Sequence, residues 1–173
     1  MVQLSIGNLV LGNKPVIKSV QHGMVTINDG QTVGTKTITS VDTNNAFVVY
    51  GIHVTASAVI DDNLCRVQLT NATTVKATRI GTSETNNVYF QVIEYYPGII
   101  KSKQLVSRAG LGNVTINAVN VSKTICFFQG YTSTETDIGE QVNNIVLLNS
   151  TTVSFKAAAY IGGTFYGIVV EFY

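Results

Sequence analysis

The sequence reads Val92-Ile93-Glu94-Tyr95-Tyr96 and, 77 positions later, Val169-Val170-Glu171-Phe172-Tyr173. Two further blocks recur in the same order, Ile17–Gln21 as Ile100–Gln104 and Leu69–Val75 as Leu147–Val153. Self-similarity at a near-constant spacing is typical of a structural unit that has been duplicated. We therefore expect two tandem modules of roughly 80 residues each.

Each module is predicted to consist of β-strands. Runs rich in β-branched and aromatic residues recur in both modules, at 46–50 and 88–93 in the first and at 124–128 and 165–170 in the second. No window has the apolar periodicity of a helix. Turn residues separate the runs, at Asn28-Asp29-Gly30, Asn44-Asn45, Asp61-Asp62-Asn63, Asn86-Asn87 and Gly162-Gly163. We predict an all-β chain of two small antiparallel β-sandwiches, with roughly six strands each.

The two prolines predict the module boundaries. Pro15 and Pro97 each stand just before an Ile-Lys-Ser opening, and proline is tolerated where strands start. This places an N-terminal strand arm at 1–14, module 1 at 15–96 and module 2 at 97–173. Ile17 matches Ile100, 83 positions later, whereas Ile38 matches Ile116, only 78 positions later. Module 1 is therefore longer in this region, and we expect its loop at about residues 21–35 to be an addition outside the core.

The last strand of each module is apolar on both faces. Ile93 and Tyr95 point to one side and Val92 and Glu94 to the other, and the second module repeats this pattern. A strand that is half exposed to water should alternate cleanly between apolar and polar residues. We therefore expect the second face to be covered by the sister module, by the arm or by another chain.

Composition excludes several classes of function. Charged residues make up 12% of the chain, about half the usual share, while 45% hydrophobic residues argue against disorder. The net charge of +1 comes without a basic stripe, so we expect no nucleic-acid binding. Apolar runs are shorter than the ~18 residues of a membrane helix, and the start lacks the positive region of a signal peptide. We expect synthesis in a cytoplasm.

No residue pattern indicates a metal, a cofactor or a catalytic centre. His22 and His53 have no second ligand at metal spacing, and the Asp61-Asp62 turn lacks the spacing of an EF-hand. Cys65 and Cys126 occupy different positions in the repeat. We interpret them as small buried apolar residues, the alternative being a disulfide between the modules.

Glu94 and Glu171 are equivalent carboxylates. A catalytic pair of carboxylates has to lie within about 10 Å, whereas equivalent positions of two modules normally lie a module apart. We therefore expect a structural role for both. With no nucleophile motif in the sequence, an enzyme is the least favoured class.

Four blocks of the first module, at 16–23, 41–50, 69–79 and 92–96, follow a recognisable pattern. The pattern is an Ile-Lys-Ser-Ile-Gln-Arg-Gly opening, a Val-Asp-Thr-Ser-Lys block, a Leu-Thr-Asn strand and a Val-Glu-Tyr/Phe ending. By these blocks the first module resembles a β-module that is common in virion structural proteins of tailed bacteriophages. Module 2 departs at Asn120–Lys123 and at Lys103, where the opening expects an apolar residue such as Val20.

The resemblance implies a non-enzymatic virion component, as part of a head decoration, a collar or a tail fibre, and it brings no catalytic residues. It places the protein in a phage particle after synthesis in a bacterial cytoplasm. Its expected partners are further copies of itself and other virion proteins.

Assembly through strand edges is also expected from the composition. Soluble monomers usually protect sheet edges with Lys and Pro, which are scarce here, and pairing with a neighbour removes the exposed edge. The arm is the candidate docking strand, through Val2, Leu4, Ile6, Leu9 and Leu11. Deleting residues 1–14 is expected to leave both modules folded and to abolish assembly.

The alternative function is recognition of a host-surface glycan or protein. Aromatic platforms for it are available in module 2, at Tyr131, Tyr160, Tyr166 and Tyr173. Tyrosine is enriched in strands and at interfaces alike, so these positions are also typical of a core or a subunit contact. A glycan array separates recognition from scaffolding.

Overall fold

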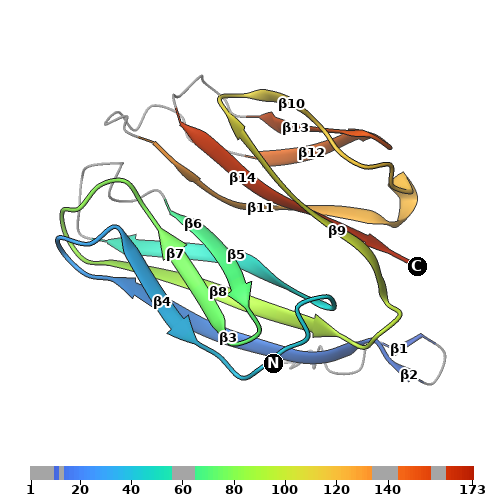
Figure 1. The fold of residues 1–173 in the computed structure, drawn as a ribbon, viewed down its shortest axis with the longest axis horizontal. Helices are drawn as coiled ribbons and strands as arrows, with labels where there is room; N and C mark the ends of the chain where they lie inside the picture. Colours follow the sequence, from blue (N-terminus) through green and yellow to red (C-terminus); the bar gives the residue numbers. More distant parts are fainter. Residues whose placement is uncertain (1–9, 12–13, 56–64, 134–143, 157–162) are drawn as a thin grey trace, which may run out of the picture.

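The computed structural model describes residues 10–11, 14–55, 65–133, 144–156 and 163–173, and these ranges form an all-β protein of antiparallel sheets (Figure 1). We call strands β3–β8 the first half and strands β9–β14 the second half. The first half contains β3 (Ile17–Ile27), β4 (Val33–Thr37), β5 (Ala46–Thr55), β6 (Arg66–Asn71), β7 (Thr74–Thr78) and β8 (Asn86–Tyr95). The second half contains β9 (Ile100–Ala109), β10 (Gly112–Thr115), β11 (Thr124–Thr132), β12 (Asn144–Asn149), β13 (Thr152–Lys156) and β14 (Thr164–Phe172), with a 3₁₀ turn, η2, at Val121–Lys123.

The first half is organised around β8 and β7. Strand β8 lies between β3 and β5, and β7 lies between β4 and β6, all antiparallel. Alternate residues of β8 point into a shared core, because Val88, Phe90 and Val92 are buried with Val67 and Val75 of the facing strands. Valine dominates this core, as expected for strands in which β-branched side chains pack on a pleated surface.

The second half has the same pairing order. Strand β14 lies between β9 and β11, and β13 lies between β10 and β12. Its core contains Val153, Phe155, Phe165 and Val169, and the ring of Tyr131 lies tilted against that of Phe165 at a ring-centroid distance of 4.6 Å. Aromatic residues therefore occupy much of the volume that valine fills in the first half.

One six-stranded sheet crosses from the first half to the second, in the order β4-β7-β6-β11-β14-β9. Its crossing point pairs Gly130 with Arg66, and the Tyr131 amide donates to the Cys65 carbonyl at 3.3 Å. Gly130 has φ +110°, and a Cβ on it would lie 1.9 Å from the Cys65 oxygen. Only glycine lets the two strands approach this closely.

The expectation that the second face of β8 and β14 is covered is confirmed, and the cover is the other half of the chain. Phe47, Ile93 and Tyr95 of the first half form one apolar cluster with Ile168 and Val170 of the second half. The ring of Phe47 stacks on Tyr95 at 5.9 Å and on Phe127 at 5.1 Å, and Tyr95 meets Phe172 edge-on at 5.6 Å. We call this cluster the inter-half core.

Two local expectations were wrong. The segment predicted to decorate the first half, about residues 21–35, contains the end of β3, where Val25 and Ile27 are fully buried, so only the turn after Ile27 is an addition. Asn86 and Asn87 lie within β8 rather than in a turn. Both side chains have partners in the folded sheet, because Asn86 donates to Cys65 Sγ at 3.3 Å and Asn87 accepts from Thr26 Oγ1 at 2.9 Å.

The arm is described only in part. Strand β1 (Val10–Leu11) pairs with β2 (Lys14–Pro15), so this part of the arm folds back as a short hairpin near the start of β3 (Figure 1). Leu11 lies in this ladder opposite Lys14. Val2, Leu4, Ile6 and Leu9 lie outside the described residues. Among the helices of the described ranges, none is long and apolar enough to cross a membrane.

Candidate assembly surfaces

A buried carboxylate ties the loop before β5 to the last strand of the first half. Glu94 of β8 accepts hydrogen bonds from Lys18 Nζ at 2.9 Å, Ser19 Oγ at 3.0 Å and the Asp42 amide at 2.9 Å. Burial, the largest single influence, raises the pKa of Glu94, but the three donors together outweigh it and hold this pKa below its ordinary value. The carboxylate is therefore ionised and fully engaged.

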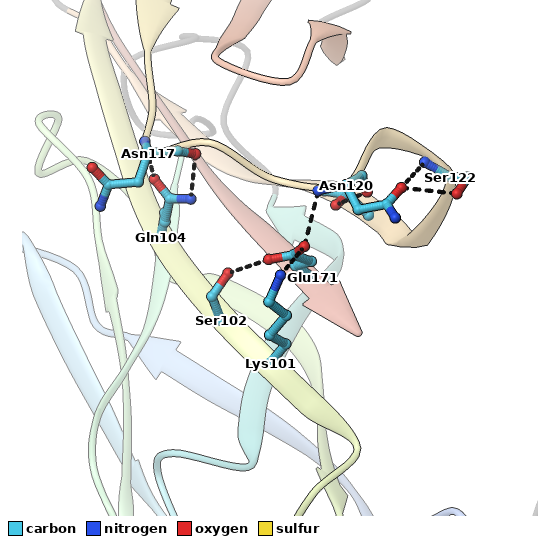
Figure 2. A network of polar contacts seen from close by, with 8 residues as sticks. Lys101, Ser102, Gln104, Asn117, Asn120, Ser122 and Glu171 are labelled. Atoms are coloured by element: carbon cyan, nitrogen blue, oxygen red, sulfur yellow. Dashed lines mark hydrogen bonds and ion pairs between the residues drawn. The ribbon is translucent and has the colours of Figure 1, made fainter. Parts of the chain in front are cut away.

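Glu171 of β14 repeats this arrangement in the second half (Figure 2). It accepts from Lys101 Nζ at 2.9 Å, Ser102 Oγ at 3.2 Å and the Asn120 amide at 2.9 Å. The hydrogen bond from Lys101 is the main reason that the pKa of Glu171 is lowered, and the Asn120 amide adds to it. Each carboxylate is held by donors of its own half, which is the structural role expected for both.

A glutamine on the first strand of each half holds the same loop further along. The Gln104 side chain donates to the Asn117 carbonyl at 3.0 Å and accepts from the Asn117 amide at 2.7 Å (Figure 2). Gln21 binds the backbone of Thr39 in the same two-way manner, at 2.9 and 2.8 Å. Both glutamines belong to the repeated Ile-Lys-Ser block, so the block recurs because it anchors a loop in each half.

The departure at Asn120–Lys123 preserves the function of the loop. Asn120 Oδ1 accepts from the Ser122 amide at 3.1 Å and from its hydroxyl at 2.8 Å, which starts the 3₁₀ turn η2. In the first half Asp42 Oδ1 accepts from the Asn44 amide at 2.9 Å. Asn and Asp both bond to the backbone two residues ahead, so the two sequences build comparable turns.

The departure at Lys103 belongs to the contact between the halves. Its ammonium group donates to the carbonyl oxygens of Thr43 and, at 2.6 Å, Ala46, which lie at the turn into β5. Burial lowers the pKa of Lys103, against a smaller opposing effect of Asp42. At the matching place in the repeat, β3 of the first half has Val20. The lysine on β9 therefore marks the one of these two strands that makes the inter-half contact.

A second inter-half contact involves Arg66 and Tyr166. The guanidinium carbon of Arg66 lies 4.1 Å from the centre of the Tyr166 ring, a cation–π geometry. Beside it is a small hollow of about 60 Å³. Tyr89 occupies the matching position on β8, where the hollow measures about 480 Å³ and is lined by His22, Gly23, Met24, Gly51, Phe90 and Gln91. The Tyr89 hollow is thus the open counterpart of a contact made inside the chain.

Arg79 is a buried cation that the sequence patterns did not single out. It donates to the carbonyl oxygens of Gln31 at 3.1 Å, Ser83 at 2.9 Å, Asn28 at 3.2 Å and Glu84 at 2.7 Å. A guanidinium group that is directed at backbone carbonyls closes loops rather than binding a substrate. It joins the turn after β3 to the turn before β8.

The four candidate tyrosines are not equivalent. Tyr131 is 1% exposed and belongs to the core of the second half, so it offers no platform on the surface. Tyr166 is half-buried under Arg66, whereas Tyr173 at the end of the chain is 69% exposed. Tyr160 lies outside the described residues. Tyrosine has the same strand preference in a core as at an interface, so composition alone could not separate these cases.

The remaining candidates for chemistry have ordinary structural environments. Cys65 is a free, buried thiol whose pKa burial raises to about 12, and Cys126 is free and half-buried. His22 is exposed at the rim of the Tyr89 hollow, while the His53 side chain and Asp61-Asp62 fall outside the description. Within the described ranges, no group of three His, Cys, Asp or Glu residues could hold a metal ion.

Several large apolar side chains on strands remain exposed. The aliphatic ones are Val33, Leu105, Ile125, Val146 and Leu148, and Tyr89 on β8 is exposed as well. Val146 and Leu148 share the edge strand β12, which sequence reasoning did not single out. The available signal was its composition, because Asn144–Asn149 contains no charged residue.

Comparison with known proteins found no match to this chain, whether among family models, curated proteins or solved structures.

Proposed function

We propose that the protein is a non-enzymatic structural component of a tailed-phage particle, located in its head decoration, collar or tail, and built from two tandem β-sandwich modules that arose by duplication. The modules are residues 15–96 and 97–173, preceded by the arm. The protein is made in the bacterial cytoplasm. Its partners are further copies of itself and other particle proteins.

The paired polar networks are the main support for the duplication. Glu94 and Glu171 each bind a Lys-Ser pair and one loop amide at nearly the same distances. The pairing order of the strands is also the same in the two halves. Two unrelated folds have no reason to agree in topology and in a buried network at once.

One observation carries the assembly role: the two halves associate through a strand edge and the apolar outer faces of their sheets. Strand β6 meets β11 at Gly130, while Phe47, Ile93, Ile168 and Val170 form the inter-half core. Modules that join in this way inside a chain have surfaces suited to joining between chains. The weakly charged, Asn- and Thr-rich remainder of the surface favours packing among neighbours.

Quantitative mass spectrometry of purified phage particles tests the proposal. We expect the chain to be a particle component in a fixed ratio to the major head or tail protein, resistant to a high-salt wash because the contacts are apolar. The control is a cytoplasmic enzyme of the same lysate, which should fall to background during purification. A chain that disappears together with this enzyme is not a particle component.

A further inference from the structure

The β12 strand has an unpaired edge. In the described part of the chain β12 pairs with β13 and with no other strand, so it ends the β10-β13-β12 sheet. Val146 and Leu148 on this strand are 38% and 48% exposed. The ladder runs regularly from Asn144 to Leu147 and shifts register only beyond it. An exposed edge of this kind presents unpaired amide and carbonyl groups together with apolar side chains.

This edge lacks charge and exposes apolar side chains. In the three larger sheets, the edge strands β9, β4 and β3 each carry Lys. The edge strands β5, β10 and β12 carry no Lys, Arg, Asp, Glu or Pro. Of these three, β12 is the one whose described side chains include large apolar residues that are exposed, Val146 and Leu148. Charged residues on an edge oppose pairing with another chain, and the β12 edge has none.

The strand that matches β12 in the first half has its edge occupied. By pairing order β6 corresponds to β12, and the edge of β6 meets β11 at the Arg66–Gly130 pair. Among the described residues, this edge position therefore meets a further strand at one residue pair in the first half and meets none in the second half. The fold itself provides the precedent for strand addition at β12.

A second copy cannot add to β12 by repeating the joint inside the chain. That joint needs Gly130, because a Cβ there would lie 1.9 Å from a carbonyl oxygen. Strand β5 corresponds to β11 by pairing order, and Ile52, which lies in the register shift between Tyr50 and His53, is the sequence counterpart of Gly130. Any residue other than glycine at that position has a Cβ, which this joint excludes, so a head-to-tail chain of copies is not formed in this way.

We propose that β12 pairs antiparallel with β12 of a second copy of this chain, about a two-fold axis at Val146. In this register Val146 faces its own counterpart, Ile145 faces Leu147, and Asn144 faces Leu148. Paired residues share one face of a sheet, so the inner residues Ile145 and Leu147 extend the core of the second half across the axis. The pairing closes a symmetric dimer and removes both open edges. The inference deepens the proposed assembly role and rests on it.

Light scattering coupled to size exclusion tests the dimer on the purified full-length chain. We expect twice the chain mass of 18.6 kDa, and the single-chain mass for the double variant Val146→Lys/Leu148→Lys. The matched control is Val33→Lys, which adds a charge at a 47% exposed valine on β4 and should leave the dimer intact. A monomeric wild type, or a lysine pair on β12 that stays dimeric while folded by circular dichroism, would overturn the inference.

A cross-link tests the register. Oxidised Val146→Cys should give a disulfide-linked dimer on a non-reducing gel, because residues that face each other on antiparallel strands lie within disulfide reach. Val33→Cys should remain monomeric on the same gel, with Cys65 and Cys126 unchanged in both proteins. If Val146→Cys fails to cross-link, or does so no faster than Val33→Cys, the axis at Val146 is wrong.

The dimer and the particle role can fail separately. Monomeric protein found in particles would contradict only this inference, whereas dimeric protein absent from particles would contradict only the proposed function.

Discussion

At the scale of single residues, two differences between the halves mark their contact. Lys103 stands where the first half has Val20, and its ammonium group binds two carbonyl oxygens across the contact. Gly130 stands where the first half has Ile52, and its missing side chain lets β11 reach β6. Departures from the repeat thus fall where the halves must differ in order to join.

Replacing Gly130 by alanine should destabilise the protein strongly. The new methyl group would collide with the Cys65 carbonyl, and the backbone has φ +110°. We expect Gly130→Ala to lower the free energy of unfolding by at least about 2 kcal/mol more than Gly30→Ala. Gly30 is the control because it also has a positive φ, +75°, but no atom lies within 4 Å of the added Cβ. Equal losses in urea unfolding would show that the close approach is not needed.

At the scale of elements, the sequence predicted strands better than it predicted their neighbours. Apolar residues on both faces of β8 and β14 correctly indicated two covered faces, because which face a residue points to follows from the local period of two residues. The β6–β11 pairing could not be predicted, since it depends on a glycine among many and on residues far apart in the chain. The turn prediction at Asn86 and Asn87 was wrong for a related reason, because their hydrogen-bond partners Cys65 and Thr26 lie next to them only in the folded sheet.

The two glutamate networks should make stability depend on acid pH. The pKa of Glu94 and of Glu171 is lower in the folded chain than the ordinary 4.5, so the unfolded chain binds protons first as the pH falls. Their stabilising contribution is complete above about pH 4.5 and is lost below it, as the pH passes through the folded pKa. We expect the unfolding free energy to decrease over this range in chemical denaturation.

The double variant Glu94→Gln/Glu171→Gln should flatten this pH dependence. Glu84→Gln removes a charge at an exposed turn and serves as the control, which should retain the slope of the wild type. A double variant with an unchanged slope below pH 4.5 would mean that other carboxyl groups, such as Asp42, govern the acid range.

At the scale of the whole molecule, the arm is separable from the folded halves. Strand β1 pairs with β2, and the described core residues begin at Val16. We expect deletion of residues 1–14 to leave the thermal unfolding temperature within a few degrees of that of the full chain, while abolishing incorporation into particles. Particles that take up the truncated chain at the full-length ratio would remove the arm as a docking segment.

The candidate surfaces show where sequence reasoning ends. A shortage of charge directed attention to strand edges, but it did not identify which edge, because the position of β12 at the end of its sheet follows only from the sheet order. Tyr131 and Tyr173 have the same side chain, yet one is in a core and the other in solvent. Repeat and composition thus predicted the all-β fold class, whereas the choice of a candidate surface needs the sheet order.

The six-stranded sheet has a consequence for how the chain loses its structure. Strands from both halves belong to one six-stranded sheet, joined at the Gly130–Arg66 pair, and the ring of Phe47 in the first half stacks on that of Phe127 in the second. Melting either half alone would leave aromatic rings and a strand edge of the survivor in water. A state with only one half unfolded therefore has a high free energy. We expect the two halves to unfold together, in a single step, under heat or mechanical force.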